Sequence, residues 1–176
     1  MAQKSKIIEK ENLAKKHSRR VTPIALYGKG HSYKNNAKKF SLLTELVTKP
    51  ENTMTPLEKM NMASSGIRKS DLVNLKEKAK LDYDKLAKAL AVTRATLINK
   101  KGKAKFSVAL SERIVGLADI YSYGYAVFED VDRFNQWMFR ANKALGGQIP
   151  YDIIGNQFGR EEVKNIIGRI DYGVYS

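Results

Sequence analysis

Few side chains in this chain of 176 residues combine the types and spacing that catalysis or metal binding needs. The two histidines, His17 and His31, have no second ligand at metal-binding spacing beside them. Cysteine is absent, which excludes disulfides, thiolate metal ligands and cysteine nucleophiles. Glu129, Asp130 and Asp132 form an acidic cluster, but carboxylates at the start of a predicted helix are more often caps than acid–base groups. We therefore predict that the chain is not an enzyme and holds no metal ion and no cofactor.

The basic side chains are concentrated in the first three fifths of the chain. The formal net charge is +14, from 32 Lys and Arg against 18 Asp and Glu. Residues 1–105 hold 25 basic and 9 acidic side chains, whereas residues 106–176 hold 7 and 9. This excess favours a polyanion such as DNA as partner, although a solvated lysine surface has the same composition. The asymmetry predicts a nucleic-acid-binding front and a different role for the near-neutral C-terminal part.

Residues 83–102 have the spacing of a helix-turn-helix. Ala87 is the small residue at the crossing of two short helices, and Ala91 stands four residues later, in the tight turn. A second helix, running from its cap Thr93 to Lys101 and stopping at Gly102, would lie in the major groove of DNA. The residues expected to contact bases or phosphates are Thr93, Arg94, Thr96, Asn99, Lys100, Lys101 and Lys103. A helical hairpin used only for packing would have the same apolar spacing.

The elements around this motif are predicted to be helices almost throughout. Pro56 follows a capping threonine at one helix start, and Ser70 is the expected N-cap of a helix before the motif, whose own first cap is Asp82 or Asp84. A longer helix follows from about residue 107, with one apolar stripe that leaves Asp119 off the buried side. Strand patterns are nearly absent, so the fold class is all-α.

Three further helices are predicted after residue 128. Asp130 and Asp132 open the first, Pro150 starts the second and Gly159 ends it. Glu161 and Glu162 favour the N-terminus of the last, where carboxylates meet the positive end of the helix dipole. The apolar runs are all too short to span a bilayer, and the N-terminus lacks the apolar stretch of a signal peptide. A soluble, cytoplasmic protein without a membrane segment is the expectation.

The two ends of the chain differ in character. Residues 1–34 are a basic arm without apolar periodicity, which could add phosphate contacts. The last residues are apolar and rich in tyrosine, with Gly173 as a bend between Tyr172 and Val174. Such an end is suited to a partner's groove, because tyrosine combines a large apolar area with a polar tip. It could equally fold back and complete the chain's own core.

Several segments together resemble a known family. They are GIRKSDL at 66–72, LAKALAV at 86–92, Thr96-Leu97, the segment around Trp137, NKALGGQIP at 142–150 and RIDYGVYS at 169–176. Over residues 65–176 the chain is similar to the Xre/MbcA/ParS antitoxins that pair with RES-domain toxins. The resemblance implies an Xre-like DNA-binding half and a C-terminal half that blocks the active-site cleft of an NAD-consuming toxin.

This resemblance also implies domains and a set of partner-binding residues. The expected domains are a basic N-terminal extension over 1–65, an Xre-like helix-turn-helix domain over 66–128 and a toxin-binding domain over 129–176. The expected toxin-binding residues are Trp137, Leu145, Gly146, Gly147, Arg169, Tyr172, Gly173, Val174, Tyr175 and Ser176.

The resulting hypothesis is a homodimeric type II antitoxin that neutralises a RES-domain toxin and represses its own operon by binding operator DNA. A free-standing helix-turn-helix regulator, whose C-terminal domain only dimerises, is the alternative. A basic RNA-binding accessory protein is less favoured, because the aromatic residues lie away from the lysines.

Overall fold

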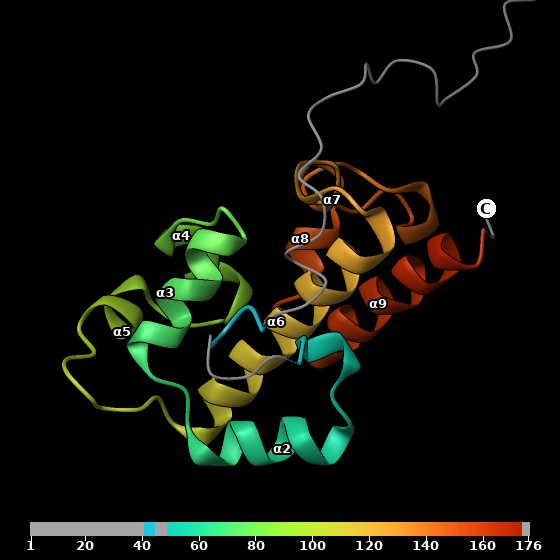
Figure 1. Ribbon diagram of the computed structural model, residues 1–176. Helices are drawn as coiled ribbons and strands as arrows, with labels where there is room; N and C mark the ends of the chain where they lie inside the picture. Colours follow the sequence, from blue (N-terminus) through green and yellow to red (C-terminus); the bar gives the residue numbers. More distant parts are fainter. Residues whose placement is uncertain (1–40, 45–48, 174–176) are drawn as a thin grey trace, which may run out of the picture. The chain divides into compact units, whose positions relative to one another are not determined.

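The described part of the chain is helical. The structure, a computed structural model, describes residues 41–44 and 49–173. Over these residues the elements (Figure 1) are the 3₁₀ helices η1 (Glu51–Thr53) and η2 (Lys143–Leu145) and the α-helices α2 (Pro56–Ser65), α3 (Lys69–Lys78), α4 (Tyr83–Ala89), α5 (Arg94–Ile98), α6 (Val108–Phe128), α7 (Val131–Met138), α8 (Pro150–Ile153) and α9 (Gln157–Asp171). Within the same ranges the β structure is limited to an isolated bridge between Arg68 and Lys105. The predicted all-α fold is confirmed. None of the helices described is both long and apolar enough to cross a membrane.

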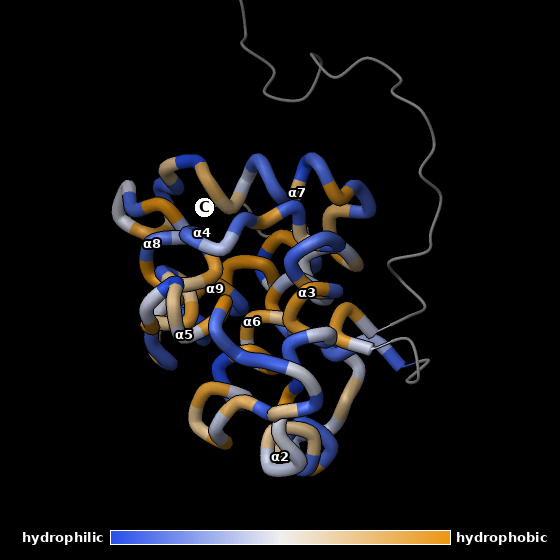
Figure 2. Tube along the Cα trace, turned by 90° about the vertical axis from the view of Figure 1, so that its left-hand side faces the viewer, coloured by the Kyte–Doolittle hydropathy of each residue, from blue (hydrophilic) through white to orange (hydrophobic). Residues whose placement is uncertain are grey.

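Helix α6 is the element around which the others pack. It begins after Ser107, whose Oγ accepts a hydrogen bond from the Leu110 N–H at 3.3 Å, as the predicted start near residue 107 requires. Helices α2, α7 and α9 and the short η1 lie against it, and Figure 2 shows α6 enclosed by the other helices, with much of its tube hydrophobic. Because neighbours cover several sides, burial extends well beyond the single predicted stripe.

Asp119 shows the consequence of this enclosure. It was predicted to lie off the buried side of its helix, but it is only 6% exposed. Lys59 of α2 donates to its Oδ1 at 2.7 Å, and Lys164 of α9 donates to its Oδ2 at 2.6 Å. A buried carboxylate is tolerated when its charge is paired and hydrogen-bonded. The prediction was wrong because helices far away in the sequence cover the face that looks polar in α6 alone.

The helices before α6 have short-range caps, one of which differs from the prediction. Helix α3 begins after Arg68, whose N–H donates to the Asp71 carboxylate at 2.9 Å. Ser70 was expected to be that cap; instead it lies inside the first turn. Helix α4 is capped by Asp82, which accepts from the Lys85 N–H at 2.7 Å. The choice left open between Asp82 and Asp84 is therefore decided.

Two of the last three helices begin or end at residues other than those predicted. Asp130 caps α7, and Pro150 starts α8, as expected. However, Gly159 does not end α8: it lies in the first turn of α9, which begins after its cap Asn156. A Cβ on Gly159 would lie 1.7 Å from the Ile153 carbonyl oxygen, so glycine permits the close approach of two helices. Glu161 and Glu162 consequently follow that first turn, and the prediction of a later helix start was wrong.

One continuous hydrophobic cluster joins the described segments. Leu42 and Leu43 are buried in it, and the carboxylate of Glu51 accepts hydrogen bonds from their backbone N–H groups at 3.0 and 3.1 Å. The cluster extends through the leucines of α3 to α5 and through α6 to Val163 and Ile167 of α9. The basic arm over 1–34 lies outside the described residues.

Candidate functional site

A sharp turn joins α4 and α5, the two helices of the predicted helix-turn-helix. Ala91 has a left-handed backbone with φ of 50°. Its N–H donates to the Lys88 carbonyl at 3.1 Å, and the Val92 N–H donates to the Ala87 carbonyl at 3.0 Å. This pair of hydrogen bonds is the Schellman arrangement that ends many helices, where the left-handed residue is usually glycine. Ala91 therefore forms the predicted turn, at a backbone strain of about 1 kcal/mol.

Helix α5 is short and firmly held on one side. Leu97 is fully buried, and Thr93 caps the helix by accepting from the Thr96 N–H at 3.2 Å, with the two hydroxyl oxygens 2.8 Å apart. The helix ends at Ile98, not at the predicted Lys101. Lys69 of α3 donates one ammonium N–H to the Ile98 carbonyl oxygen, which satisfies an acceptor at the helix end.

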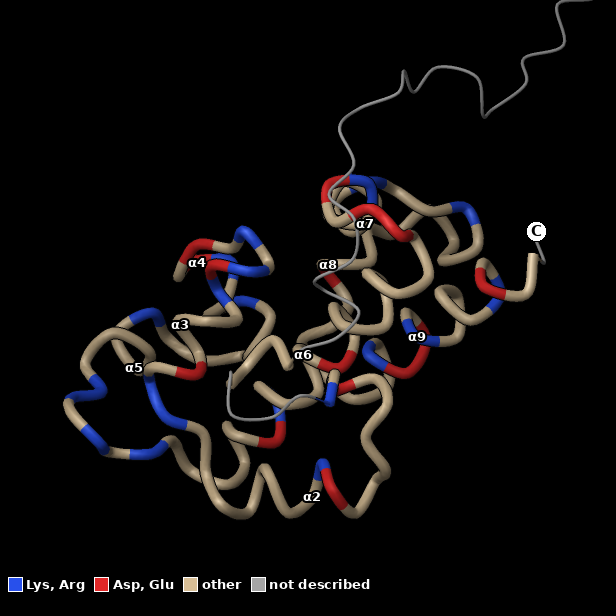
Figure 3. Tube along the Cα trace, in the orientation of Figure 1, with Lys and Arg blue, Asp and Glu red and all other residues tan. Residues whose placement is uncertain are grey.

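The lysines predicted to contact phosphates therefore lie on the loop between α5 and α6. Lys101 and Lys103 are exposed, and Figure 3 shows basic residues gathered along this loop. Lys100 is half-buried, and its Nζ lies 5.6 Å from the centre of the Phe106 ring. This packing accounts for a lysine at a position where a buried apolar residue is common, because the aliphatic stem covers the ring while the ammonium group stays near solvent.

Arg94, the residue predicted to read bases, has a partner that the sequence spacing did not suggest. Its Nη1 donates to the Asp84 carboxylate, at 3.2 Å from Oδ2 and 3.4 Å from Oδ1. Asp84 belongs to the first turn of α4 and Arg94 to the first turn of α5. Their contact depends on the angle between the two helices, and the sequence analysis considered Asp84 only as a candidate helix cap.

The predicted DNA-contact residues all lie on α5, at its two caps or on the loop that follows it. Thr93, Arg94, Thr96, Asn99, Lys101 and Lys103 are exposed, and Lys100 is half-buried. Asp84, which the sequence analysis considered only as a helix cap, and Lys69 join these residues through their contacts with Arg94 and Ile98. We call this set of residues the α5 surface.

A backbone turn at residues 142–147 contains three of the predicted toxin-binding residues. Gly146 and Gly147 have φ of 64° and 84°, a left-handed conformation that side chains rarely adopt. The Gly147 N–H donates to the Asn142 carbonyl, and the Asn142 N–H donates to the Gln148 carbonyl, both at 2.9 Å. Leu145, predicted to contact a partner, is buried with 8% exposure, so its side chain packs into the core beneath this turn.

Trp137 stands at the edge of an aromatic cluster. Its ring stacks on Phe134 with centroids 5.8 Å apart and lies 5.4 Å from Phe128. Phe134 is fully buried and also contacts Tyr121 and Tyr125 edge to face. Burial raises the pKa of Tyr121 and of Tyr125 above the ordinary phenol value, which keeps both hydroxyls protonated. Trp137 itself is half-buried.

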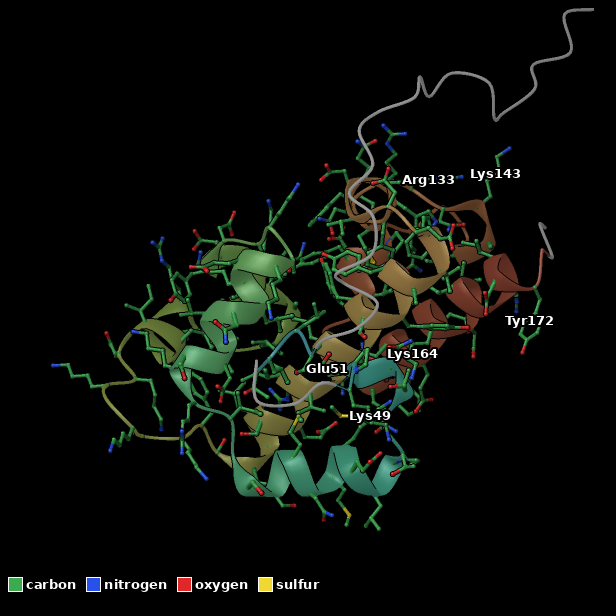
Figure 4. All side chains as sticks on the ribbon, in the orientation of Figure 1. Lys49, Glu51, Arg133, Lys143, Lys164 and Tyr172 are labelled. Atoms are coloured by element: carbon green, nitrogen blue, oxygen red, sulfur yellow. The ribbon has the colours of Figure 1, made fainter. Side chains whose placement is uncertain are left out.

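The end of α9 exposes a large aromatic side chain. Tyr172 is 85% exposed, and Figure 4 shows it pointing away from the helix. Arg169 and Gly173, the neighbouring predicted contact residues, are exposed as well. Val174, Tyr175 and Ser176 lie outside the described residues. Tyr172 therefore does not complete the core of the chain. We call Trp137, the turn at 142–147 and the end of α9 the C-terminal surface.

The candidates for acid–base or metal chemistry are accounted for by local structure. Asp130 Oδ1 accepts from the N–H groups of Asp132 and Arg133 at 2.9 and 3.0 Å, which is a helix cap. In the ranges that the structure describes, no three His, Asp or Glu residues are grouped so that they could hold a metal ion. His17 and His31 lie outside those ranges.

Two family models match the chain over most of the described residues. The antitoxin Xre-like helix-turn-helix domain matches residues 60–119, and the antitoxin Xre/MbcA/ParS C-terminal toxin-binding domain matches residues 124–173. The chain belongs to the Xre/MbcA/ParS antitoxin family. A curated relative named Antitoxin Xre, from Photorhabdus laumondii subsp. laumondii, is 34% identical over 76 residues. This match covers 43% of this chain and 51% of the relative, so the chain spans about half the length of that relative.

The limits of the two family domains fall inside one helix of the chain. The first match ends at Asp119 and the second begins at Gly124, and both residues belong to α6. Ile120 and Tyr121, which lie between the matches, are fully buried. The α5 surface and the C-terminal surface therefore rest on one hydrophobic cluster that continues through α6.

Proposed function

We propose that this antitoxin binds and inhibits a RES-domain, NAD-consuming toxin through the C-terminal surface. The observation that carries the proposal is the exposure of Tyr172, at 85%, within the segment that matches a toxin-binding domain. Burying an exposed tyrosine ring against a partner stabilises the complex, and tyrosine is enriched in the cores of interfaces. The tail at 174–176 would continue this contact into the cleft of the toxin.

We also propose that the antitoxin represses its own operon through the α5 surface, as a homodimer. The support is the family's helix-turn-helix match together with the exposed Arg94, Asn99, Lys101 and Lys103 of that surface. A helix of five residues reaches few base pairs, and helix-turn-helix proteins commonly bind two half-sites as dimers. Sedimentation of the free antitoxin at micromolar concentration tests the dimer directly.

The toxin proposal is tested by co-expression with the RES-domain toxin of the same genome. Tyr172→Ala should weaken toxin binding at least tenfold and allow the toxin to deplete cellular NAD and stop growth. Phe158→Ala removes another exposed aromatic ring from α9, 82% exposed, and serves as the matched control. Both variants should melt within about 1 °C of the unaltered protein, since surface substitutions change stability little. Full protection by Tyr172→Ala, or failure of the unaltered protein to bind the toxin, would contradict the proposal.

The DNA proposal is tested with the promoter of the antitoxin's own operon. Arg94→Ala should relax sequence preference and cost about 1–3 kcal/mol, whereas Lys103→Ala should weaken binding to all sequences alike. Equal affinity of the unaltered protein for promoter and random DNA would exclude the repressor role. Specific DNA binding without a co-purifying toxin would favour the alternative, a free-standing helix-turn-helix regulator.

A further inference from the structure

The ion pair between Asp84 and Arg94 lies within the α5 surface, where a carboxylate is unfavourable for DNA binding. The two side chains are 70% and 58% exposed, and exposed pairs of this kind contribute little to folding. Asp84 is also not needed as the cap of α4, because Asp82 already accepts the Lys85 N–H at 2.7 Å. Capping therefore does not account for Asp84, and its position in the first turn of α4 and its exposed ion pair each stabilise the fold only slightly.

The geometry of the pair leaves part of the arginine fork open. Both hydrogen bonds to Asp84 use Nη1 alone. Among residues 41–44 and 49–173, no acceptor is hydrogen-bonded to Nη2 or Nε of Arg94. An arginine fork with two parallel N–H donors matches the O6 and N7 acceptors of guanine in the major groove. The guanidinium group can thus hold Asp84 on one side and a base on the other.

We propose that Asp84 is a positioning residue that orients Arg94 toward a guanine, and so sets the base preference at that position of the DNA site. This inference rests on the proposed binding of operator DNA. Asp84 restricts the rotamers of a long side chain that otherwise loses considerable entropy on binding. Its negative charge simultaneously repels the phosphate backbone, which lowers affinity for DNA of any sequence.

Asp84 should therefore raise discrimination at one base pair while it lowers affinity for DNA of any sequence. An experiment that measures both quantities tests the inference. DNA sites are first selected from a random pool with the unaltered full-length protein. Dissociation constants are then measured at one salt concentration for the selected site, its single-base variants and random DNA. The variants are Asp84→Asn, Asp84→Glu, Arg94→Ala and the double variant Asp84→Asn with Arg94→Ala. Asp132→Asn is the control, because it makes the same chemical change in another exposed pair, with Lys80.

Asp84→Asn should bind random DNA about two to three times more tightly, because a repulsive charge is gone. Its discrimination should fall about three- to fivefold, the range of an exposed pair, and only at the base pair that Arg94→Ala also relaxes. Asp84→Glu should retain part of that discrimination. In the Arg94→Ala background, Asp84→Asn should change no base preference, and Asp132→Asn should change neither quantity.

Three results would overturn the inference while leaving DNA binding intact. Asp84→Asn could tighten the selected site and random DNA by the same factor, which would make Asp84 a repulsive charge only. It could alter preference at a different base pair, or still alter it in the Arg94→Ala background, which would make Asp84 a direct reader of a base. Failure of the unaltered protein to select any sequence would instead remove the proposed repressor function, and with it the role of Asp84.

Discussion

The α5 surface and the C-terminal surface differ in what holds their exposed groups. On the α5 surface, long charged side chains extend from a five-residue helix and the loop that follows it. On the C-terminal surface, Gly146 and Gly147 shape the backbone, and Trp137 is stacked on a fully buried Phe134. The first surface is dominated by exposed charged side chains, whereas the second is shaped by a backbone turn and a stacked ring.

This difference indicates how each surface would recognise its partner. Exposed lysines suit a phosphate backbone, because its charge attracts them whatever the base sequence, and such binding depends strongly on salt. A hydrogen-bonded turn and an exposed tyrosine suit a complementary protein surface, where binding depends on shape and apolar area. We therefore expect the two surfaces to respond differently to salt and to substitutions that alter core packing or the backbone.

The largest effect is expected from Gly124→Ala, which disturbs the support of the C-terminal surface. A Cβ on Gly124 would lie 2.1 Å from Cε2 of Phe134, inside the aromatic cluster. Overpacking of this kind should cost about 3 kcal/mol and lower the melting temperature by roughly 10 °C. Trp137 is the single tryptophan, so its fluorescence should shift to the red as the cluster loosens.

Gly168→Ala is the matched control for this substitution. Its Cβ would meet only the Tyr123 hydroxyl at 3.4 Å, an ordinary contact, within the long helix α9. Because alanine is the better helix former, this variant should be as stable as the unaltered protein or more stable by about 0.5 kcal/mol. Equal melting temperatures and emission spectra for both variants would mean that the cluster does not support Trp137.

The next largest effect is expected from salt, which should weaken DNA binding much more than toxin binding. If four cations of the α5 surface each displace one counterion, DNA affinity should fall about 100-fold between 0.05 and 0.2 M salt. Toxin affinity should change less than about threefold over the same range, because shape and apolar burial are only weakly screened. Fluorescence anisotropy with labelled DNA and with labelled toxin measures both. Parallel salt dependence for the two partners would refute the distinction drawn between the surfaces.

Two glycine substitutions, one on each surface, test the role of the backbone with a smaller loss of stability. Gly147→Ala and Gly102→Ala both place a side chain at a positive φ, 84° and 60°, in open space. Each should cost about 1–2 kcal/mol of stability through backbone strain alone. Gly147→Ala should weaken toxin binding severalfold and leave DNA binding unchanged. Gly102→Ala should have little effect on either, because the loop between α5 and α6 adapts. Loss of DNA affinity in Gly102→Ala would show that the backbone conformation of this loop also matters for binding.

The smallest effect is expected at the turn of the helix-turn-helix. Ala91→Gly relieves the strain of φ at 50° but adds freedom to the unfolded chain. The two nearly balance, so the variant should gain about 0.5 kcal/mol, visible as a rise of 1–2 °C in melting temperature. DNA binding should be unchanged, since Ala91 lies outside the predicted contact residues. A clear loss of stability would mean that the methyl group of Ala91 packs usefully at the turn.

The features that the sequence alone determined are those with short-range causes. Thr93, Ser107 and Asp130 cap their helices through hydrogen bonds that span only two or three residues. The turn at Ala91 is closed by bonds of similarly short range. The periodic apolar residues of α4 and α5 then follow from helix geometry. These patterns predicted the helix-turn-helix and the all-α fold, because each depends on neighbours in the chain.

Only the tertiary structure decided the features that depend on residues far apart in the sequence. Asp119 is buried because Lys59 and Lys164 arrive from helices about sixty residues before it and 45 after it. The Asp84–Arg94 pair likewise depends on the crossing of two helices. Side-chain burial and pairing across elements are set by packing, and a pattern read along one segment contains no information about what covers it.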